Sequence, residues 1–213
     1  MSTIQSEEQA RDYVRALCNV SAFANLGRLV DGLIAENRNQ NLIAEPTVEI
    51  IWQRHIADSA QLLEHVSRGT SPWLDLGSGP GLPGLVLAVM RPELKFVLIE
   101  ERQKRTNWLV QMVARLQLPN VSIEASRLQT VPRQDAGVIS ARAFAPLAKL
   151  LKLSARFSTS ETAWVLPKGR SAEQEIRALP ERLQQVFHVK QSLTSADAGI
   201  IVGRGQIRAG ELP

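Results

Sequence analysis

The ten residues DLGSGPGLPG, Asp75 to Gly84, decide the fold class of this chain. They follow the apolar run WLDL at 73–76, which is typical of a strand, and they open a stretch with helical spacing. Glycines let the backbone turn sharply and approach a ligand without an intervening Cβ, and Pro83 suits the first turn of a helix. Because free N–H groups at a helix start can bind a ligand, and ligands of open parallel sheets bind beyond the carboxyl ends of the strands, this run predicts a ligand-binding loop.

Two acidic residues help to choose the ligand. The glycines fit both G-x-G-x-G, starting at Gly77, and the dinucleotide fingerprint G-x-G-x-x-G, starting at Gly79. A buried Asp75 beside the loop repels a pyrophosphate but can hold an ammonium group, which S-adenosylmethionine carries. Glu100 ends the next strand, where an acid can accept hydrogen bonds from ribose hydroxyls, and this suits NAD equally well. The residues favour S-adenosylmethionine, and they leave open a nicotinamide or flavin cofactor and a tight turn that binds nothing.

The rest of the chain divides into two parts. Residues 1–70 show helical spacing without a convincing strand, and after residue 71 short apolar runs alternate with helical stretches. The expected helices lie at 7–19, 22–36, 46–66, 84 onward, 104–117, 147–157 and 172–185. The expected strands lie at 73–76, 95–100, 121–125, 137–141, 162–167, 186–193 and 199–203. We therefore predict a helical N-terminal cap, 1–70, and an α/β domain, 71–213, whose seven-stranded sheet is mostly parallel with helices on both faces.

Composition restricts the class of protein. Hydrophobic residues make up 44% of the 213 residues and charged residues 22%, which is typical of a globular protein rather than a disordered one. The single cysteine, Cys18, cannot form an internal disulfide, and we find neither a signal-peptide pattern nor an apolar run of membrane-spanning length. We expect a cytoplasmic protein that does not bind membranes. Residues 1–70 carry a net charge of −3 and residues 71–213 a net charge of +7, which suggests a polyanionic partner for the second part.

Several further motifs in one order carry a family resemblance. They are NLIAEP and WQRHIADS upstream of the glycine loop, and ISARAFAPL and LPKGRSAEQEI downstream. With the loop they resemble the bacterial 16S rRNA (guanine-N7) methyltransferase family, also called glucose-inhibited division protein B, over about Asn41 to Ile176. The resemblance implies a class I methyltransferase (Rossmann-like) fold, S-adenosylmethionine as cofactor, and methylation of N7 of one guanine in 16S rRNA of the small ribosomal subunit.

The resemblance also assigns residues. Gly77 and Leu82 match loop positions that contact S-adenosylmethionine, Leu128 and Gln129 match a pair that flanks the adenine, and Arg142 matches the arginine of the family's SRAF motif. Gln129 stands where the family often has Glu, and Ala141 replaces the usual Ser before the arginine. The full expected cofactor set is Asp75, Gly77, Gly79, Leu82, Glu100, Leu128, Gln129 and Arg142.

No catalytic residue is assigned, because guanine N7 needs none for proton transfer. Methylases of exocyclic amines typically carry Asn or Asp before Pro-Pro and an aromatic after the fourth strand, where this chain has ISARAF. A cytosine-carbon methylase would need a cysteine nucleophile, and Cys18 lies far away in a predicted helix. The N7 lone pair lies in the ring plane and bears no proton, so positioning alone, worth roughly 7–11 kcal/mol, can supply catalysis. We expect no obligatory general base.

The expected partner is 16S rRNA or the 30S ribosomal subunit, bound by a monomer. Candidate RNA contacts are Arg142, Lys168, Arg170 and His55; for Lys149, Lys152 and Arg177 a solvated surface charge is an equal alternative. His55 has no second His or Cys at ligand spacing, so no metal site is expected. The rival functions are a class I methyltransferase for another RNA or a small molecule, a non-enzymatic ribosome-binding protein, and an oxidoreductase.

Overall fold

A seven-stranded, mostly parallel sheet forms the centre of the molecule. The computed structural model describes residues 3–212. The strands run in the order β3-β2-β1-β4-β5-β7-β6; the first five are parallel, and β7 is antiparallel to both β5 and β6. They are β1 Trp73–Leu76, β2 Phe96–Ile99, β3 Val121–Glu124, β4 Val138–Ser140, β5 Ala163–Lys168, β6 Phe187–Gln191 and β7 Gly199–Arg204. The sheet and each of the seven expected strands are thereby confirmed.

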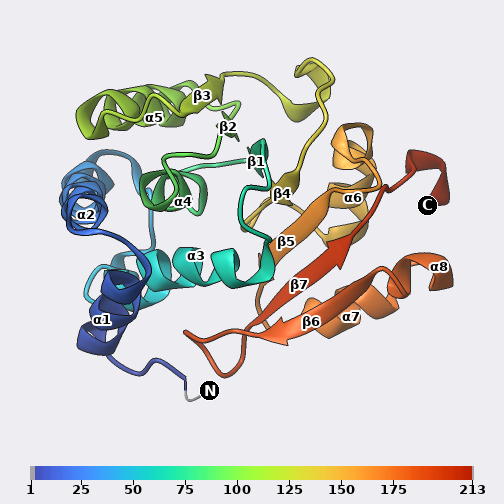
Figure 1. Ribbon diagram of the computed structural model, residues 1–213, viewed down its shortest axis with the longest axis horizontal. Helices are drawn as coiled ribbons and strands as arrows, with labels where there is room; N and C mark the ends of the chain where they lie inside the picture. Colours follow the sequence, from blue (N-terminus) through green and yellow to red (C-terminus); the bar gives the residue numbers. More distant parts are fainter. Residues whose placement is uncertain (1–2, 213) are drawn as a thin grey trace.

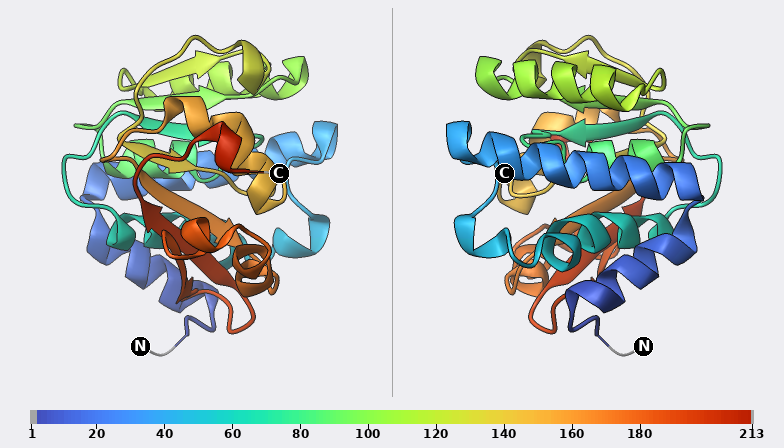
Figure 2. Two further views of the ribbon diagram at one scale, coloured as in Figure 1. Left: turned by 90° about the vertical axis from the view of Figure 1, so that its right-hand side faces the viewer. Right: turned by 90° about the vertical axis from the view of Figure 1, so that its left-hand side faces the viewer.

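Helices cover both faces of this sheet (Figures 1 and 2). On one face pack α1 Glu7–Leu17, α2 Val20–Gln40, α3 Asp58–Ala60, α4 Gly84–Met90 and α5 Gln103–Leu116; on the other lie α6 Leu147–Ser154, α7 Ala172–Arg177 and α8 Glu181–Gln184. Within residues 3–212, no helix is both long and apolar enough to cross a bilayer.

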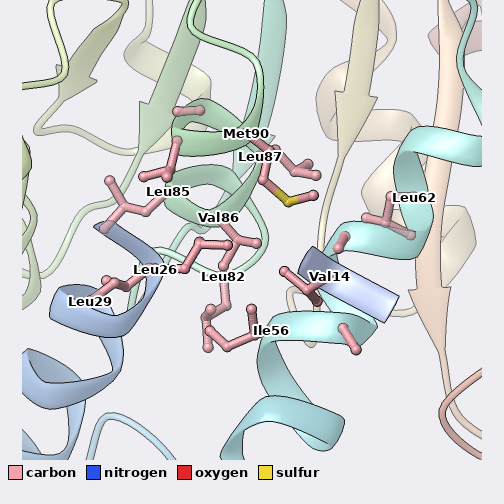
Figure 3. Packing of buried hydrophobic residues seen from close by; sticks show 14 of the residues in the cluster. Val14, Leu26, Leu29, Ile56, Leu62, Leu82, Leu85, Val86, Leu87 and Met90 are labelled. Atoms are coloured by element: carbon pink, nitrogen blue, oxygen red, sulfur yellow. The ribbon is translucent and has the colours of Figure 1, made fainter. Parts of the chain in front are cut away.

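Alternation along the strands builds two cores. In β1, Trp73 joins the hydrophobic cluster under α2 and α4, whereas Leu74 and Leu76 join the cluster under α6 and α7. Successive strand residues point to opposite faces, so a sheet covered on both sides needs apolar residues at nearly every position. Figure 3 shows the first cluster, in which Leu26 of α2 packs beside residues of α4. The N-terminal helices thus share one core with the sheet, and their separation at residue 70 into a cap stays a prediction.

Several expected helices differ from the structure in their ends or their continuity. The helix expected at 22–36 extends to Gln40, where Asn41 ends it with a φ of 46°. The buried Asn37 side chain donates to the Glu45 carboxylate and accepts the N–H of Ile43 just after this end. The helix expected at 172–185 is two helices, because Pro180 lacks the N–H that would continue the first.

The single helix expected at 46–66 is also wrong. It consists of short 3₁₀ segments, η1 Glu45–Thr47 and η3 Gln61–His65, around a π-helical turn, η2 Trp52–Ala57, and α3. The Glu7 carboxylate of α1 accepts the N–H groups of Trp52 and Gln53, at 3.0 and 2.7 Å, and so fixes where η2 begins. Turns of the π type are rare and concentrate at functional sites, and this one carries His55.

Candidate active site

The glycine loop lies at the carboxyl end of β1, as predicted. Gly77, Gly79 and Gly81 have φ of 65°, 55° and 90°, a region that side chains with a Cβ rarely adopt. At the start of α4, a Cβ added to Gly84 would lie 2.8 Å from Asp75 Oδ2. The loop therefore requires glycine both for its turns and for the close approach of α4 to the sheet.

Asp75 is buried under this loop at the centre of a hydrogen-bond chain. Trp73 Nε1–H donates to Ser140 Oγ at 2.8 Å, Ser140 Oγ–H donates to Asp75 Oδ1 at 2.8 Å, and the N–H of Gly84 donates to Asp75 Oδ2 at 3.2 Å. Burial raises the pKa of Asp75 to about 6, although these hydrogen bonds and the nearby Arg142 oppose the shift. The Asp75 side chain is 1% exposed, and its hydrogen bonds link β1 to β4 and to α4. Its contact with a cofactor ammonium stays a prediction.

Glu100 lies beside the loop at the end of β2. Its carboxylate accepts the N–H of Gly79 at 2.9 Å and that of Arg102 at 2.8 Å. Each carboxylate oxygen retains a lone pair for a further donor, so ribose hydroxyls remain compatible with this arrangement.

A cavity of about 540 Å³ brings several predicted cofactor residues together. Gly77, Glu100, Leu128 and Gln129 all line it. Its volume falls within the range of small-ligand sites, roughly 300–1,000 Å³. The Glu100 carboxylate, the glycine-loop backbone beside it and the apolar Leu128 fit a nucleoside with an amino-acid tail, so the residues present fit S-adenosylmethionine. We call this space the cofactor cavity.

Of the other predicted cofactor residues, Asp75, Gly79 and Leu82 do not line this cavity, and Arg142 lines a neighbouring one. Leu82 is the one whose side chain lies in the hydrophobic core. Its side chain is 3% exposed and packs into the core between Val86 and Ile56 (Figure 3). Any cofactor contact of Leu82 therefore involves its main chain, and that contact stays a prediction.

A second cavity of about 650 Å³ adjoins the first, and we call it the substrate-side cavity. Basic and aromatic side chains line it, among them Arg54, Arg142, Phe144 and Lys168. Phe144 also lines the cofactor cavity, and its ring packs on the Cα of Gly77, so that a Cβ there would come within 2.4 Å. Sequence analysis missed Phe144; the available signal was an aromatic residue two positions after the motif arginine.

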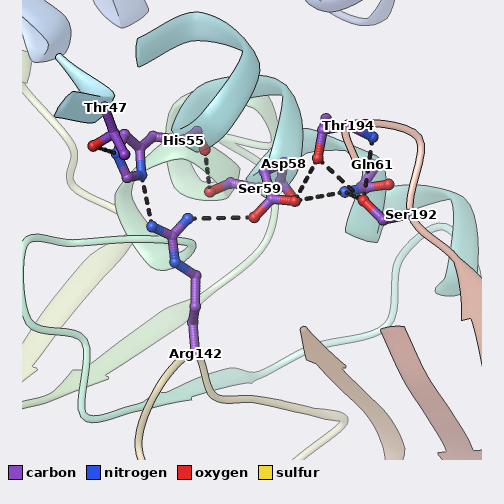
Figure 4. Close-up of polar contacts among 8 residues, drawn as sticks. All are labelled: Thr47, His55, Asp58, Ser59, Gln61, Arg142, Ser192 and Thr194. Atoms are coloured by element: carbon purple, nitrogen blue, oxygen red, sulfur yellow. Dashed lines mark hydrogen bonds and ion pairs between the residues drawn. The ribbon is translucent and has the colours of Figure 1, made fainter. Parts of the chain in front are cut away.

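Arg142 is held at the edge of this cavity by residues of the N-terminal region (Figure 4). Its Nη2 lies 2.6 Å from His55 Nδ1, and its Nη1 lies 3.4 Å from Asp58 Oδ2. Asp58 Oδ1 in turn accepts from Thr194 Oγ1 at 2.7 Å and from Gln61 Nε2 at 2.9 Å. Segments more than a hundred residues apart in the sequence thus fix one guanidinium.

His55 is buried in this cluster, with 3% exposure. Burial, followed by the charges of Arg142 and Arg54, lowers the pKa of His55 to about 3. The ring contacts Arg142 and offers almost no exposed surface. A direct RNA contact of His55 stays a prediction.

The other predicted RNA contacts differ in their surroundings. Lys168 donates to Glu175 Oε2 at 2.8 Å and to the carbonyl of Ala145 at 2.9 Å, and only 12% of its side chain is exposed. The pKa of Glu175 is lowered because the hydrogen bond from Lys168 and others outweigh its burial. Arg170 is exposed and pairs with Asp197 at 2.7 Å. Lys168 therefore shapes the cavity wall, whereas Arg170 is open to a large ligand.

Two further basic residues lie in different surroundings. Lys149 lines the cofactor cavity, and Arg177 pairs with Glu173 on α7. Within residues 3–212, no group of three or more His, Cys, Asp or Glu side chains could hold a metal ion.

Comparisons with known proteins agree with this geometry. The family model for rRNA small subunit methyltransferase G, GidB, matches residues 13–201. A ribosomal RNA small subunit methyltransferase G of Erythrobacter litoralis is 54% identical over 96% of this chain and 99% of its own length. One from Novosphingobium aromaticivorans is 48% identical over 99% and 93%.

Solved structures agree on the fold. A SAM-dependent methyltransferase from Aquifex aeolicus superposes with a TM-score of 0.58 at 17% identity, over 75% of this chain and 93% of that one. A precorrin-6y C5,15-methyltransferase from Geobacter metallireducens gives 0.54 at 12% identity, over 78% and 92%. The predicted class I methyltransferase fold is confirmed. The glycine loop, the paired cavities and the match over most of the chain lead to one conclusion: this chain is a methyltransferase and belongs to the rRNA small subunit methyltransferase G family, GidB.

Proposed function

We propose that this protein transfers a methyl group from S-adenosylmethionine to N7 of a guanine in 16S rRNA, acting as a cytoplasmic monomer on the small ribosomal subunit. The observation that carries the proposal is the meeting of two cavities at Phe144, one suited to the cofactor and one lined by basic residues. S-adenosylmethionine supplies an electrophilic methyl group on its sulfonium. The protein then has to bring one nucleophilic ring nitrogen up to that methyl group.

The side chains around the cavities support a nucleophile that needs no deprotonation. Asp58 and Glu175, the acids lining the substrate-side cavity, are engaged in ion pairs with Arg142 and Lys168. His55 is buried behind Arg142. None of these groups is a free base directed into the cavity. Guanine N7 has an in-plane lone pair and no proton, so orientation of the base is sufficient.

Access to N7 restricts the form of the target. In A-form RNA, N7 faces a deep, narrow groove that side chains cannot read. The target guanine must therefore lie in a loop or be turned outward. Arg170 is exposed and follows Gly169, which lines the substrate-side cavity, so it offers a contact for the flanking phosphates.

The decisive experiment compares substrates. Purified protein with S-adenosylmethionine and 30S particles from a strain lacking this modification should give 7-methylguanosine on nucleoside mass spectrometry. Free 16S rRNA, unrelated RNA and small-molecule acceptors run in parallel distinguish the rival enzyme functions. Absence of any methylated nucleoside, with binding to 30S retained, would establish a non-enzymatic role instead.

Cofactor choice has its own control. S-adenosylmethionine should raise the melting temperature, and NAD should leave it unchanged, because ligand that binds only the folded state stabilises it. Stabilisation by NAD alone would contradict the proposal.

A further inference from the structure

Phe144 differs from the other phenylalanines in its surroundings. Of the five phenylalanines, three are buried in the two cores, and Phe23 packs against Trp52. Phe144 is half-buried and lines both the cofactor cavity and the substrate-side cavity. Within residues 3–212, no aromatic ring and no cation packs on it. Part of its aromatic surface is therefore available to a ligand.

The loop that carries Phe144 is held on both sides of this residue. Before it, Ala143 has a φ of 53°, a conformation that a residue with a Cβ keeps only where its surroundings enforce it. After it, the carbonyl of Ala145 accepts from Lys168 Nζ at 2.9 Å, and the N–H that opens α6 donates to Glu175 Oε2 at 2.6 Å. These contacts fix the place of the ring between the cavities without the help of a ligand.

The proposed reaction moves a positive charge onto the base. Guanine N7 takes the methyl group with its lone pair, and the electron pair of the broken sulfur–carbon bond stays on the sulfur. No proton moves, so the guanine becomes a cation whose charge is spread over its five-membered ring. Because the N7 lone pair lies in the ring plane, the plane of the base must contain the line of the transfer. The site therefore has to fix that plane and to stabilise the arriving charge.

We propose that Phe144 is the platform on which the target guanine stacks, its ring fixing the plane of the base and stabilising the charge that the base acquires. Bases held outside a helix stack on aromatic side chains, and the face of an aromatic ring attracts a cation. A base that stacks on this ring from the substrate-side cavity presents its edge to the cofactor cavity. This inference rests on the proposed function.

Two substitutions separate the aromatic face of Phe144 from its bulk. Phe144→Tyr keeps the face, whereas Phe144→Leu keeps an apolar side chain without it. In single turnovers with saturating S-adenosylmethionine and 30S particles, Phe144→Leu should lower the rate by about tenfold or more, because a base–aromatic stack is lost. Phe144→Tyr should stay within about threefold of the wild type on the same scale.

Phe157 offers the matched control, because its ring is fully buried in the cluster under α6 and α7. Phe157→Leu should lower the melting temperature and leave the single-turnover rate unchanged. If Phe144 served only as a wall of the cofactor cavity, saturating S-adenosylmethionine would restore the rate of Phe144→Leu. Such a restoration would overturn the inference, as would equal losses in the Leu and Tyr variants.

A binding measurement needs no methyl transfer. With ¹³C-labelled phenylalanine, the ring signals of Phe144 are assigned as those that Phe144→Leu loses. Saturating 7-methylguanosine monophosphate, below neutral pH where its base is cationic, should shift these signals, and guanosine monophosphate should bind more weakly. Unshifted Phe144 signals, or equal affinities for the two nucleotides, would overturn the inference. If the wild type methylates no 30S particle but 7-methylguanosine monophosphate shifts Phe144, the proposed function fails while the stacking platform stands.

Discussion

Asp75 and His55 are buried ionisable residues whose pKa values both move in the direction that favours the neutral form. The pKa of Asp75 is raised to about 6, and that of His55 is lowered to about 3, in both cases mainly by burial. Their contributions to stability have opposite signs. Below pH 6 the folded state takes up a proton at Asp75 that the unfolded state lacks, so stability rises as the pH falls. For His55 the unfolded state takes up the proton below its ordinary pKa, so stability falls.

The contributions of Asp75 and His55 to the free energy of unfolding cancel in part between about pH 4 and pH 6. A variant that lacks one of the two groups is therefore needed to measure the other. Removing the imidazole in His55→Asn should leave the Asp75 effect uncompensated. Between pH 7 and pH 5 the wild type should lose up to about 2 kcal/mol of stability relative to the variant. Urea denaturation at the two pH values measures this difference, and parallel pH profiles would show that His55 titrates normally.

Among the elements, α4 approaches the sheet closely at its first residue, Gly84. A Cβ at Gly84 would lie 2.2 Å from a Leu98 side-chain carbon of β2 and 2.8 Å from the Asp75 carboxylate. The leucine can rotate away, but Asp75 is held by Ser140 and by the N–H of Gly84 itself. The start of α4 therefore cannot accommodate a larger residue without moving the glycine loop.

Gly84→Ala should accordingly destabilise the fold by about 1–3 kcal/mol, as overpacking does, and should weaken S-adenosylmethionine binding. Gly27 offers the matched control, because it lies within α2 and a Cβ there would meet nothing within 4 Å. Gly27→Ala should stabilise the protein by about 0.5–1 kcal/mol. Denaturation midpoints and calorimetric titration with the cofactor measure both variants. Equal behaviour of the two alanine variants would contradict the close packing of α4.

Sequence patterns predict the elements better than their ends. Every strand was predicted because apolar runs such as WLDL at 73–76 bury both faces. The segment 46–66 was predicted as one helix because spacing records which face is apolar and not whether the turns are α, π or 3₁₀. Its interruption depends on Glu7, a residue of another helix. In the site, Gly77 and Glu100 were found because they follow strand ends, whereas the contact of His55 with Arg142 spans 87 positions that no local pattern connects.

On the scale of the whole molecule, charge and cavities are unevenly distributed. The net charge of +7 belongs to residues 71–213, which supply most of the lining of the substrate-side cavity. The basic residues around it differ in how accessible they are to RNA. Lys168 is paired with Glu175 and mostly buried, whereas Arg170 is exposed. This distribution favours RNA docking through a few phosphate contacts around one cavity.

Salt dependence tests that docking surface. With three or four phosphate contacts to single-stranded RNA, the logarithm of the 30S affinity should fall with a slope of about −2 to −3 against log salt. That is a loss of roughly thirtyfold between 50 and 200 mM. Cofactor affinity should change little over this range, because S-adenosylmethionine has no phosphate. If RNA binding does not weaken with added salt, the basic surface is not where RNA docks.

The bonds from Thr194 to Asp58 and from the N–H of Leu193 to Gln61 have a consequence for biosynthesis. Chains emerge from the ribosome N-terminus first, so Asp58 is made long before the residues that hold it. Contacts between such distant positions also form late, since closing a long loop costs entropy. A nascent chain can assemble the glycine loop and its strands early, yet Asp58 and Gln61 obtain these partners only after the connection between β6 and β7 has been translated. The wall of the substrate-side cavity that carries Asp58 is therefore completed only near the end of synthesis.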